Sequence, residues 1–194
     1  MKKLVLFLLV LFFTKAKSQD TLSHFNRKRN EINQTGMKVL GGWALANIAV
    51  GSVGFYKTKG ATKYFHQMNI FWNMVNLGIA TAGFYGAKEA SNKQYSISQS
   101  ISEQRKTEKI LLINASLDVA YIAGGWYLNR RGISKSSDRL NGYGNAVILQ
   151  GAFLLLFDSS MFAIQNKHGK MADRFLNKVQ VGFNGKQIGF TAEL

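Results

Sequence analysis

The chain has 194 residues, of which 46% are hydrophobic and only 18% charged, and it contains no cysteine and no proline. The charged share lies below that of ordinary soluble domains, and the lack of cysteine excludes disulfides and thiolate metal sites. The formal net charge of +15 predicts an anionic partner. Because the basic residues lie between apolar segments, without the aromatic residues that accompany them in nucleic-acid binding, we expect the head groups of a lipid bilayer and no nucleic acid.

Residues 1–18 have the pattern of a signal peptide. Two lysines precede the apolar run Leu4–Phe13, and Ala16 and Ser18 are small residues at the positions that a signal peptidase requires. The alternative is an uncleaved membrane anchor, but the run is shorter than the roughly 20 residues that a span needs. We therefore predict cleavage after Ser18.

Residues 19–36 are polar and basic, with apolar residues at helical spacing. They predict either a short helix on the membrane surface or a solvated lead-in. Four apolar segments follow within residues 37–166, and each predicts a membrane-spanning helix. They are Val39–Tyr56, His66–Gly86, Ile110–Leu128 and Ala146–Ile164. The predicted fold class is an all-α membrane protein, a four-helix transmembrane bundle.

The second segment carries a stripe of polar side chains. At about 100° per residue, His66, Asn69, Asn73 and Asn76 fall on one face of a helix that is otherwise apolar. This pattern suits a bundle in which lipid covers the apolar faces and the amides face other helices. A second face for close helix packing is predicted by small residues at four-residue spacing: Gly78, Ala82 and Gly86.

The first and third segments resemble each other. With one gap, Leu45 and Asn47 align with Leu117 and Asp118, and both segments end in a glycine and two aromatic residues before a basic turn. We therefore predict two similar helical hairpins related by an axis along the membrane normal. The alternative is that any two spans with such endings look alike.

Polar residues within the predicted spans are the candidate ligand-binding or ion-binding residues. A charge near the centre of a bilayer costs roughly 2.5–3.5 kcal/mol on insertion scales, so an aspartate there is a functional candidate. The candidates are Asn47, His66, Asn69, Asn73, Asn76, Asn114, Asp118, Gln150 and Asp158. They either bind a cation, a proton or a small polar ligand, or form a network that fixes helix register, and we favour the network.

No catalytic residue, metal site or cofactor is predicted. The sequence contains no Gly-x-Ser-x-Gly, no His-Glu-x-x-His and no glycine-rich phosphate loop. The Gly-x-Gly-Asp motif of intramembrane aspartyl proteases is replaced around Asp158 by Phe-Asp-Ser. With three histidines and no cysteine, a zinc or haem site lacks its usual ligands.

The tail, residues 167–194, combines a basic amphipathic segment with a β-hairpin signal. Alternating apolar residues flank Asn184-Gly185, which is the strongest short-range hairpin signal. A two-residue turn would pair Val181 with Ile188 and Val179 with Phe190.

Four spans place both termini on one side of the membrane. The signal peptide puts that side outside the cytoplasm, whereas the count of lysine and arginine residues favours the opposite orientation. We give the signal peptide precedence and predict a bacterial inner-membrane protein with both mature termini outside the cytoplasm.

The signal peptide ending in Ser-Gln, the run from Phe65 to Asn73, the run from Gln150 to Asp158 and the Asn-Gly tail resemble a family of small uncharacterised four-span bacterial membrane proteins. The resemblance covers nearly the whole mature chain. It implies the four-span architecture and no activity.

Two functions compete. The first is a structural or assembly component of the cell envelope, which docks other envelope proteins or copies of itself. The second is a small transport or ligand-binding membrane protein that uses the polar core. A soluble exported helical bundle is a third possibility, because the mean hydropathy is near zero.

Overall fold

The computed structural model describes the backbone of residues 2–176, 179–183 and 188–192 and the side chains of residues 21–171. Its helices are α1 (Lys2–Lys57), α2 (Gly60–Ala90), α3 (Ile97–Ser134) and α4 (Asp138–Leu176). The strands β1 (Val179–Phe183) and β2 (Ile188–Ala192) follow and pair antiparallel. As far as Leu176 the described chain is therefore all-α and forms a four-helix bundle.

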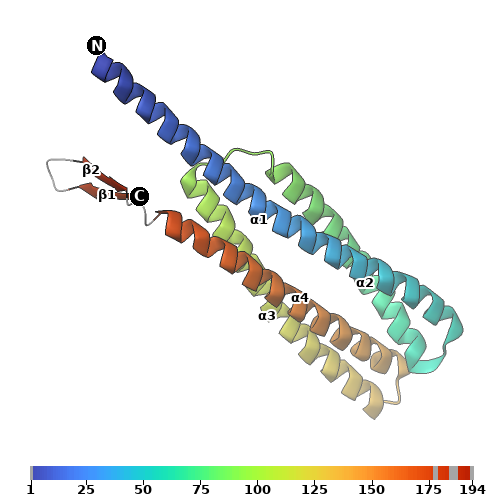
Figure 1. Cartoon of the computed structure of the whole chain (residues 1–194). Helices are drawn as coiled ribbons and strands as arrows, with labels where there is room; N and C mark the ends of the chain where they lie inside the picture. Colours follow the sequence, from blue (N-terminus) through green and yellow to red (C-terminus); the bar gives the residue numbers. More distant parts are fainter. Residues whose placement is uncertain (1, 177–178, 184–187, 193–194) are drawn as a thin grey trace.

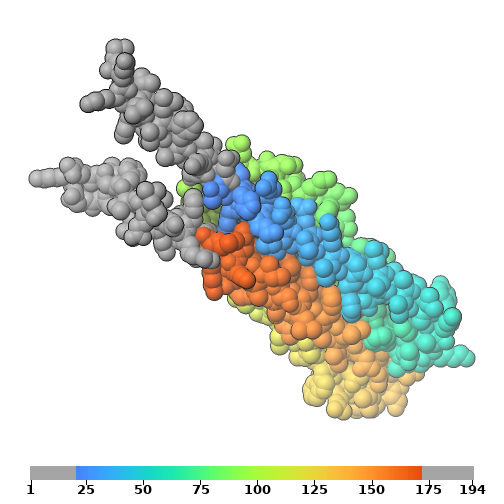
Figure 2. Space-filling view, viewed as in Figure 1, coloured from blue at the N-terminus to red at the C-terminus, as the bar shows by residue number. Residues whose placement is uncertain are grey.

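The four helices form two antiparallel hairpins that lie side by side in an elongated bundle (Figure 1). α1 packs along α2, α3 packs along α4, and α2 also packs against α4. The backbones of α2 and α3 stay farther apart, but the rings of Trp72 and Tyr121 touch edge to face with centroids 5.0 Å apart. In the space-filling view of Figure 2 the two hairpins remain visible as adjoining bodies. The two predicted hairpins are present as packing units, and their common origin stays a prediction.

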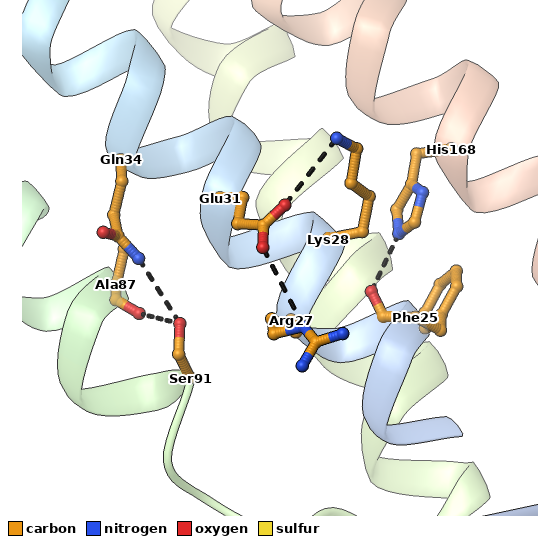
Figure 3. Close-up of polar contacts among 8 residues, drawn as sticks. All are labelled: Phe25, Arg27, Lys28, Glu31, Gln34, Ala87, Ser91 and His168. Carbon is orange, nitrogen blue, oxygen red and sulfur yellow. Dashed lines mark hydrogen bonds and ion pairs between the residues drawn. The ribbon is translucent and has the colours of Figure 1, made fainter. Parts of the chain in front are cut away.

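Local sequence explains where the helices begin. Ser96 caps α3, because its Oγ accepts from the Gln99 backbone N–H while Gln99 Oε1 accepts from the Ser96 backbone N–H, a capping box. α2 begins at Gly60, whose φ of 60° is left-handed and therefore favours glycine. After α2 the chain is tied back to α1, because Gln34 Nε2 donates to Ser91 Oγ at 3.4 Å (Figure 3).

The bundle has an inverted distribution of polarity. The buried residues of the described chain are mostly polar, whereas large aliphatic side chains lie outside; Ile79 is 54% exposed and Leu156 is 71% exposed. A water-soluble fold buries such side chains and leaves amides outside. Three helices, α1, α3 and α4, are long and apolar enough to cross a membrane. These observations favour a membrane protein over the soluble bundle.

α2 is not among those three helices, which departs from the predicted four apolar spans. Its stripe of amides lowers its hydropathy, but the amides face inward: Asn69, Asn73 and Asn76 are buried. The side of α2 that points outward carries Phe71, Met74 and further apolar residues. Composition alone therefore understates how apolar the exterior of α2 is.

The predicted second packing face of α2 is wrong. A Cβ atom added at Gly78 or Gly86 would meet nothing within 4 Å. No neighbouring helix approaches α2 closely at these two glycines.

The helical packing continues beyond residues 37–166. Asn26, Arg29 and Asn30 are buried within the bundle, so this part of the lead-in is neither a surface helix nor solvated. The basic segment that starts at Met171 continues α4 as far as Leu176.

In the tail, β1 pairs with β2 in a register that places Val181 opposite Phe190 and Phe183 opposite Ile188. This differs by two residues from the register predicted with a two-residue turn. Asn184-Gly185 itself lies outside the described residues.

Small residues allow α3 and α4 to approach closely. A Cβ atom on Gly125 of α3 would lie 2.8 Å from the Ile148 backbone nitrogen and 2.9 Å from the Gly144 carbonyl oxygen of α4. Both atoms belong to the backbone, so the clash could be relieved only by separating the helices.

We expect Gly125→Ala to lower the free energy of unfolding by about 1–3 kcal/mol, because overpacking forces backbone shifts. Its neighbour Gly124 supplies a matched control, since a Cβ atom there meets nothing within 4 Å. Gly124→Ala should leave stability unchanged or raise it by up to about 1 kcal/mol through helix propensity. Unfolding of the purified protein in one detergent, followed by circular dichroism, measures both; equal effects would contradict this account of the interface.

Candidate functional site

One buried glutamine of α4 joins three helices. Gln150 Oε1 accepts from Trp43 Nε1 of α1 at 2.9 Å, and Gln150 Nε2 donates to Asn69 Oδ1 of α2 and, at 3.4 Å, to Asn47 Oδ1 of α1. Trp43 also stacks on Phe153 of α4, with ring centroids 3.9 Å apart. A buried polar group left unpaired costs about 1–3 kcal/mol, so this network holds α1, α2 and α4 in register.

A second glutamine of α4 has the same role nearer the chain termini. Gln165 Nε2 donates to the Arg29 carbonyl oxygen at 3.1 Å and to Asn33 Oδ1 at 2.7 Å, both in α1. Gln104 Nε2 of α3 donates to the Gln165 carbonyl oxygen at 2.8 Å. Gln165 therefore ties α1, α3 and α4 together.

A cavity of about 770 Å³ lies between α2 and α3, whose backbones stay apart and whose touching Trp72 and Tyr121 rings both line it. Its volume falls within the range of small-molecule sites, about 300–1,000 Å³. All four helices line it, and its apolar lining includes Phe71, Val75 and Ile79 of α2 and Leu117 of α3. The polar lining comprises Arg29, Asn30, Asn33, Asn76, Glu103, Thr107, Asn114, Asp118 and Asp158.

Three residues that line this cavity carry a buried polar atom without a hydrogen-bond partner in the described chain. The atoms are Asn30 Nδ2, Asn76 Nδ2 and Asp118 Oδ2. Buried polar groups are nearly always paired, so each exception needs a physical explanation. A ligand with polar groups at these places would supply partners for two donors and one acceptor.

The two aspartates of the spans meet at the cavity. Asp118 in α3 and Asp158 in α4 are close neighbours at the cavity, and the Asn114 side chain lies next to Asp158. A hydrogen bond between two carboxyl groups requires a proton on one of them. A pair that shares a proton can donate as well as accept hydrogen bonds.

The structure divides the predicted site residues into two groups. Asn76, Asn114, Asp118 and Asp158 line the cavity. Asn47, Asn69 and Gln150 belong to the network around Gln150. Asn73 donates to the Asn69 carbonyl oxygen, and His66 packs against Gly54 of α1. The predicted stripe on α2 therefore does not form a single site.

Arg29 and Asn30 line the same cavity and were absent from the predicted set, because the lead-in was placed outside the bundle. The sequence did carry a signal for them: Leu22, Phe25 and Arg29 recur at helical spacing, in line with later apolar residues, and such a repeat indicates the buried face of a helix. Within residues 21–171, no three of the histidine, aspartate and glutamate side chains gather as a metal site would require.

His168 of α4 closes the end of the bundle near the termini. Its Nε2 lies 3.0 Å from the Phe25 carbonyl oxygen and donates to it, and the two rings stack with centroids 4.4 Å apart (Figure 3). Burial is the main cause that lowers the pKa of His168 below its ordinary value of 6.5. The bond to Phe25 opposes this shift, whereas the charges of Arg29, Lys28 and His24 lower the pKa further.

Comparison with known proteins gives a single kind of match. The family of unknown function DUF6992 matches residues 39–159, which is more than half of the chain. No curated protein and no solved structure shows significant similarity to the chain.

We expect Gln150→Leu to lower the free energy of unfolding by about 1–3 kcal/mol or more, because it leaves Trp43 and Asn69 without partners. Gln94→Leu, at an exposed position between α2 and α3, is the control and should have little effect. Chemical denaturation in detergent measures the difference; a neutral Gln150→Leu would show that the network does not hold the helices.

We expect acid to weaken the protein through His168. Because the pKa of His168 is lower in the folded state, the unfolded chain binds the proton first as the pH falls. The contribution of neutral His168 to the free energy of unfolding is therefore complete above pH 6.5. It is lost as the pH falls from 6.5 toward the folded-state pKa. His168→Gln, which keeps a donor for Phe25, should flatten this part of the profile of melting temperature against pH. His24→Gln removes the smallest of the charges that lower the pKa of His168, so it should leave most of the profile in place. An unchanged profile in His168→Gln would contradict the assignment.

Proposed function

The chain belongs to DUF6992, a family of unknown function, and we propose that it is an integral membrane protein that binds a small amphiphilic ligand in the cavity between α2 and α3. The observation that carries this proposal is the set of three unpartnered buried atoms, on Asn30, Asn76 and Asp118, around one cavity. A core that served only to hold helices together would satisfy its own polar atoms, as the network around Gln150 does.

The proposal assigns different tasks to the two groups of polar residues. Asn76, Asn114, Asp118 and Asp158 contact the ligand, and the mixed donors and acceptors among them suit a hydroxyl, carbonyl or amine group. Asn47, Asn69, Asn73 and Gln150 position the helices that carry them. The ligand enters from the bilayer between α2 and α3, whose backbones do not pack together although the rings of Trp72 and Tyr121 touch.

The cellular setting belongs to the same proposal. Residues 1–18 act as a signal peptide, all four helices including α2 cross the inner membrane, and both mature termini lie outside the cytoplasm. α2 packs along α1 and α4 and exposes apolar side chains, which supports its placement in the bilayer.

A structural or assembly role in the cell envelope is the second candidate. The networks around Gln150 and Gln165 support it, since they favour a rigid bundle. The paired strands β1 and β2 would then provide the docking element for a partner or a second copy.

The ligand is tested by extracting small molecules from the purified protein and identifying them by mass spectrometry. We expect the wild type to carry one amphiphile in stoichiometric amount and Asp118→Asn and Asn76→Leu to retain about tenfold less, because each loses a polar contact. Asp138→Asn, at an exposed position, is the control and should retain the wild-type amount.

Extraction of nothing beyond bulk lipid, or equal amounts from all variants, would overturn ligand binding. If in addition removal of residues 177–194 abolished the cellular role while Asp118→Asn preserved it, the structural candidate would replace the present one.

A further inference from the structure

Resting on the proposed function, we propose that the ligand is an amphiphile with an anionic head group, which Arg29 and Asn30 hold at the end of the cavity nearest the chain termini. Its single apolar chain extends from there along the uncovered side of α2.

Arg29 is a buried cation without a buried anion beside it. It is 2% exposed, and its Nη1 donates to Asn26 Oδ1 at 2.9 Å and to the Ser100 carbonyl oxygen at 3.1 Å. Its guanidinium also lies 5.3 Å from the centre of the Tyr95 ring. None of these groups carries a negative charge at neutral pH. A buried charge is costly unless it is paired, so the site favours an anion.

The ion pairs of the described chain leave Arg29 out. They join Arg27 and Lys28 to Glu31, and Lys93 to Glu89, all on the exterior (Figure 3 shows the first two). Glu103 lines the same cavity and its negative charge acts on Arg29, but the two side chains form no ion pair in the described chain. Arg29 therefore keeps donors for a carboxylate or phosphate, whose oxygen geometry suits the guanidinium fork.

Asn30 supplies the second, independent observation. Its side chain is also 2% exposed, its Nδ2 has no partner in the described chain, and it lines the cavity beside Arg29. Arg29 and Asn30 thus both carry N–H donors at the cavity, and the described chain supplies no anion to accept from them. An oxyanion satisfies both.

The cavity has room for a chain behind the head group. It is lined along α2 from Met68 to Ala90, which is about 33 Å at 1.5 Å per residue. One lipid chain occupies half of a bilayer core, about 15 Å. Phe71, Val75 and Ile79 give the chain an apolar wall. A chain with a net charge of +15 also attracts anionic amphiphiles to its surface.

The test compares nitroxide-labelled stearate with its methyl ester in phosphatidylcholine nanodiscs that contain the full-length protein. The two probes differ only in the charge of the head group, and the motionally restricted fraction of the electron paramagnetic resonance spectrum reports binding. We expect the wild type to prefer the acid by about tenfold, the scale of one charge-assisted hydrogen bond. Arg29→Gln should abolish the preference, whereas Arg27→Gln, which removes an exposed charge two residues away, should keep it.

Asn30→Leu provides a second test of the head-group site in case Arg29→Gln does not fold. Asn30 Nδ2 makes no hydrogen bond that the substitution could break, so the variant should fold and still reduce the preference for the acid. Gly86→Leu fills the cavity from a position where a Cβ atom meets open space, and it should reduce binding of both probes. Gly78→Leu, equally open but outside the cavity lining, is its control.

The outcomes separate the two proposals. If the acid preference survives in both Arg29→Gln and Asn30→Leu while Gly86→Leu weakens both probes, the anionic head group is refuted and ligand binding in the cavity stands. If Gly86→Leu leaves both probes unaffected, the cavity holds no chain and both proposals fail. Displacement of the acid by millimolar inorganic phosphate would identify a site for free anions and refute the amphiphile.

Discussion

Amides buried away from water must find partners within the protein, and this constraint determines how the four helices meet. Gln150 satisfies it by bonding to α1 and α2, and Gln165 by bonding to α1 and α3. Lipid offers helices little hydrophobic reason to associate, so hydrogen bonds and close packing of small residues such as Gly125 supply the specificity. The glutamines of α4 make that helix the centre of the bundle.

The same constraint explains why the unpaired atoms around the cavity are informative. The networks around Gln150 and Gln165 pair most of their buried amides where the helices touch, although Asn73 Oδ1 and Gln104 Oε1 have no partner in the described chain. Between those networks α2 and α3 part, and Asn76 and Asp118 are left with free atoms. These unpaired atoms occur where the backbones of α2 and α3 stay apart, and the space between the helices can hold a ligand.

The helical periodicity of apolar residues was sufficient to predict four helices. It also predicted that the amides of α2 face inward, since Asn69, Asn73 and Asn76 share one face. Periodicity could not predict which helices become neighbours, and the predictions that depended on this were wrong. The Gly78 and Gly86 stripe looks like a packing face in isolation, but no neighbouring helix approaches α2 closely there. Arg29 and Asn30 were missed for a related reason: polar residues before the first predicted span read as solvated until the helix is seen to continue through them.

That extension has a consequence for how the protein stands in the membrane. α3 has 38 residues, which is about 57 Å of helix, against about 30 Å of hydrocarbon. Residues 97–109 of α3 precede its apolar stretch and account for about 20 Å of that surplus, a compact stump of three to four helical turns. Such a stump is reachable by water-soluble molecules that never enter the bilayer.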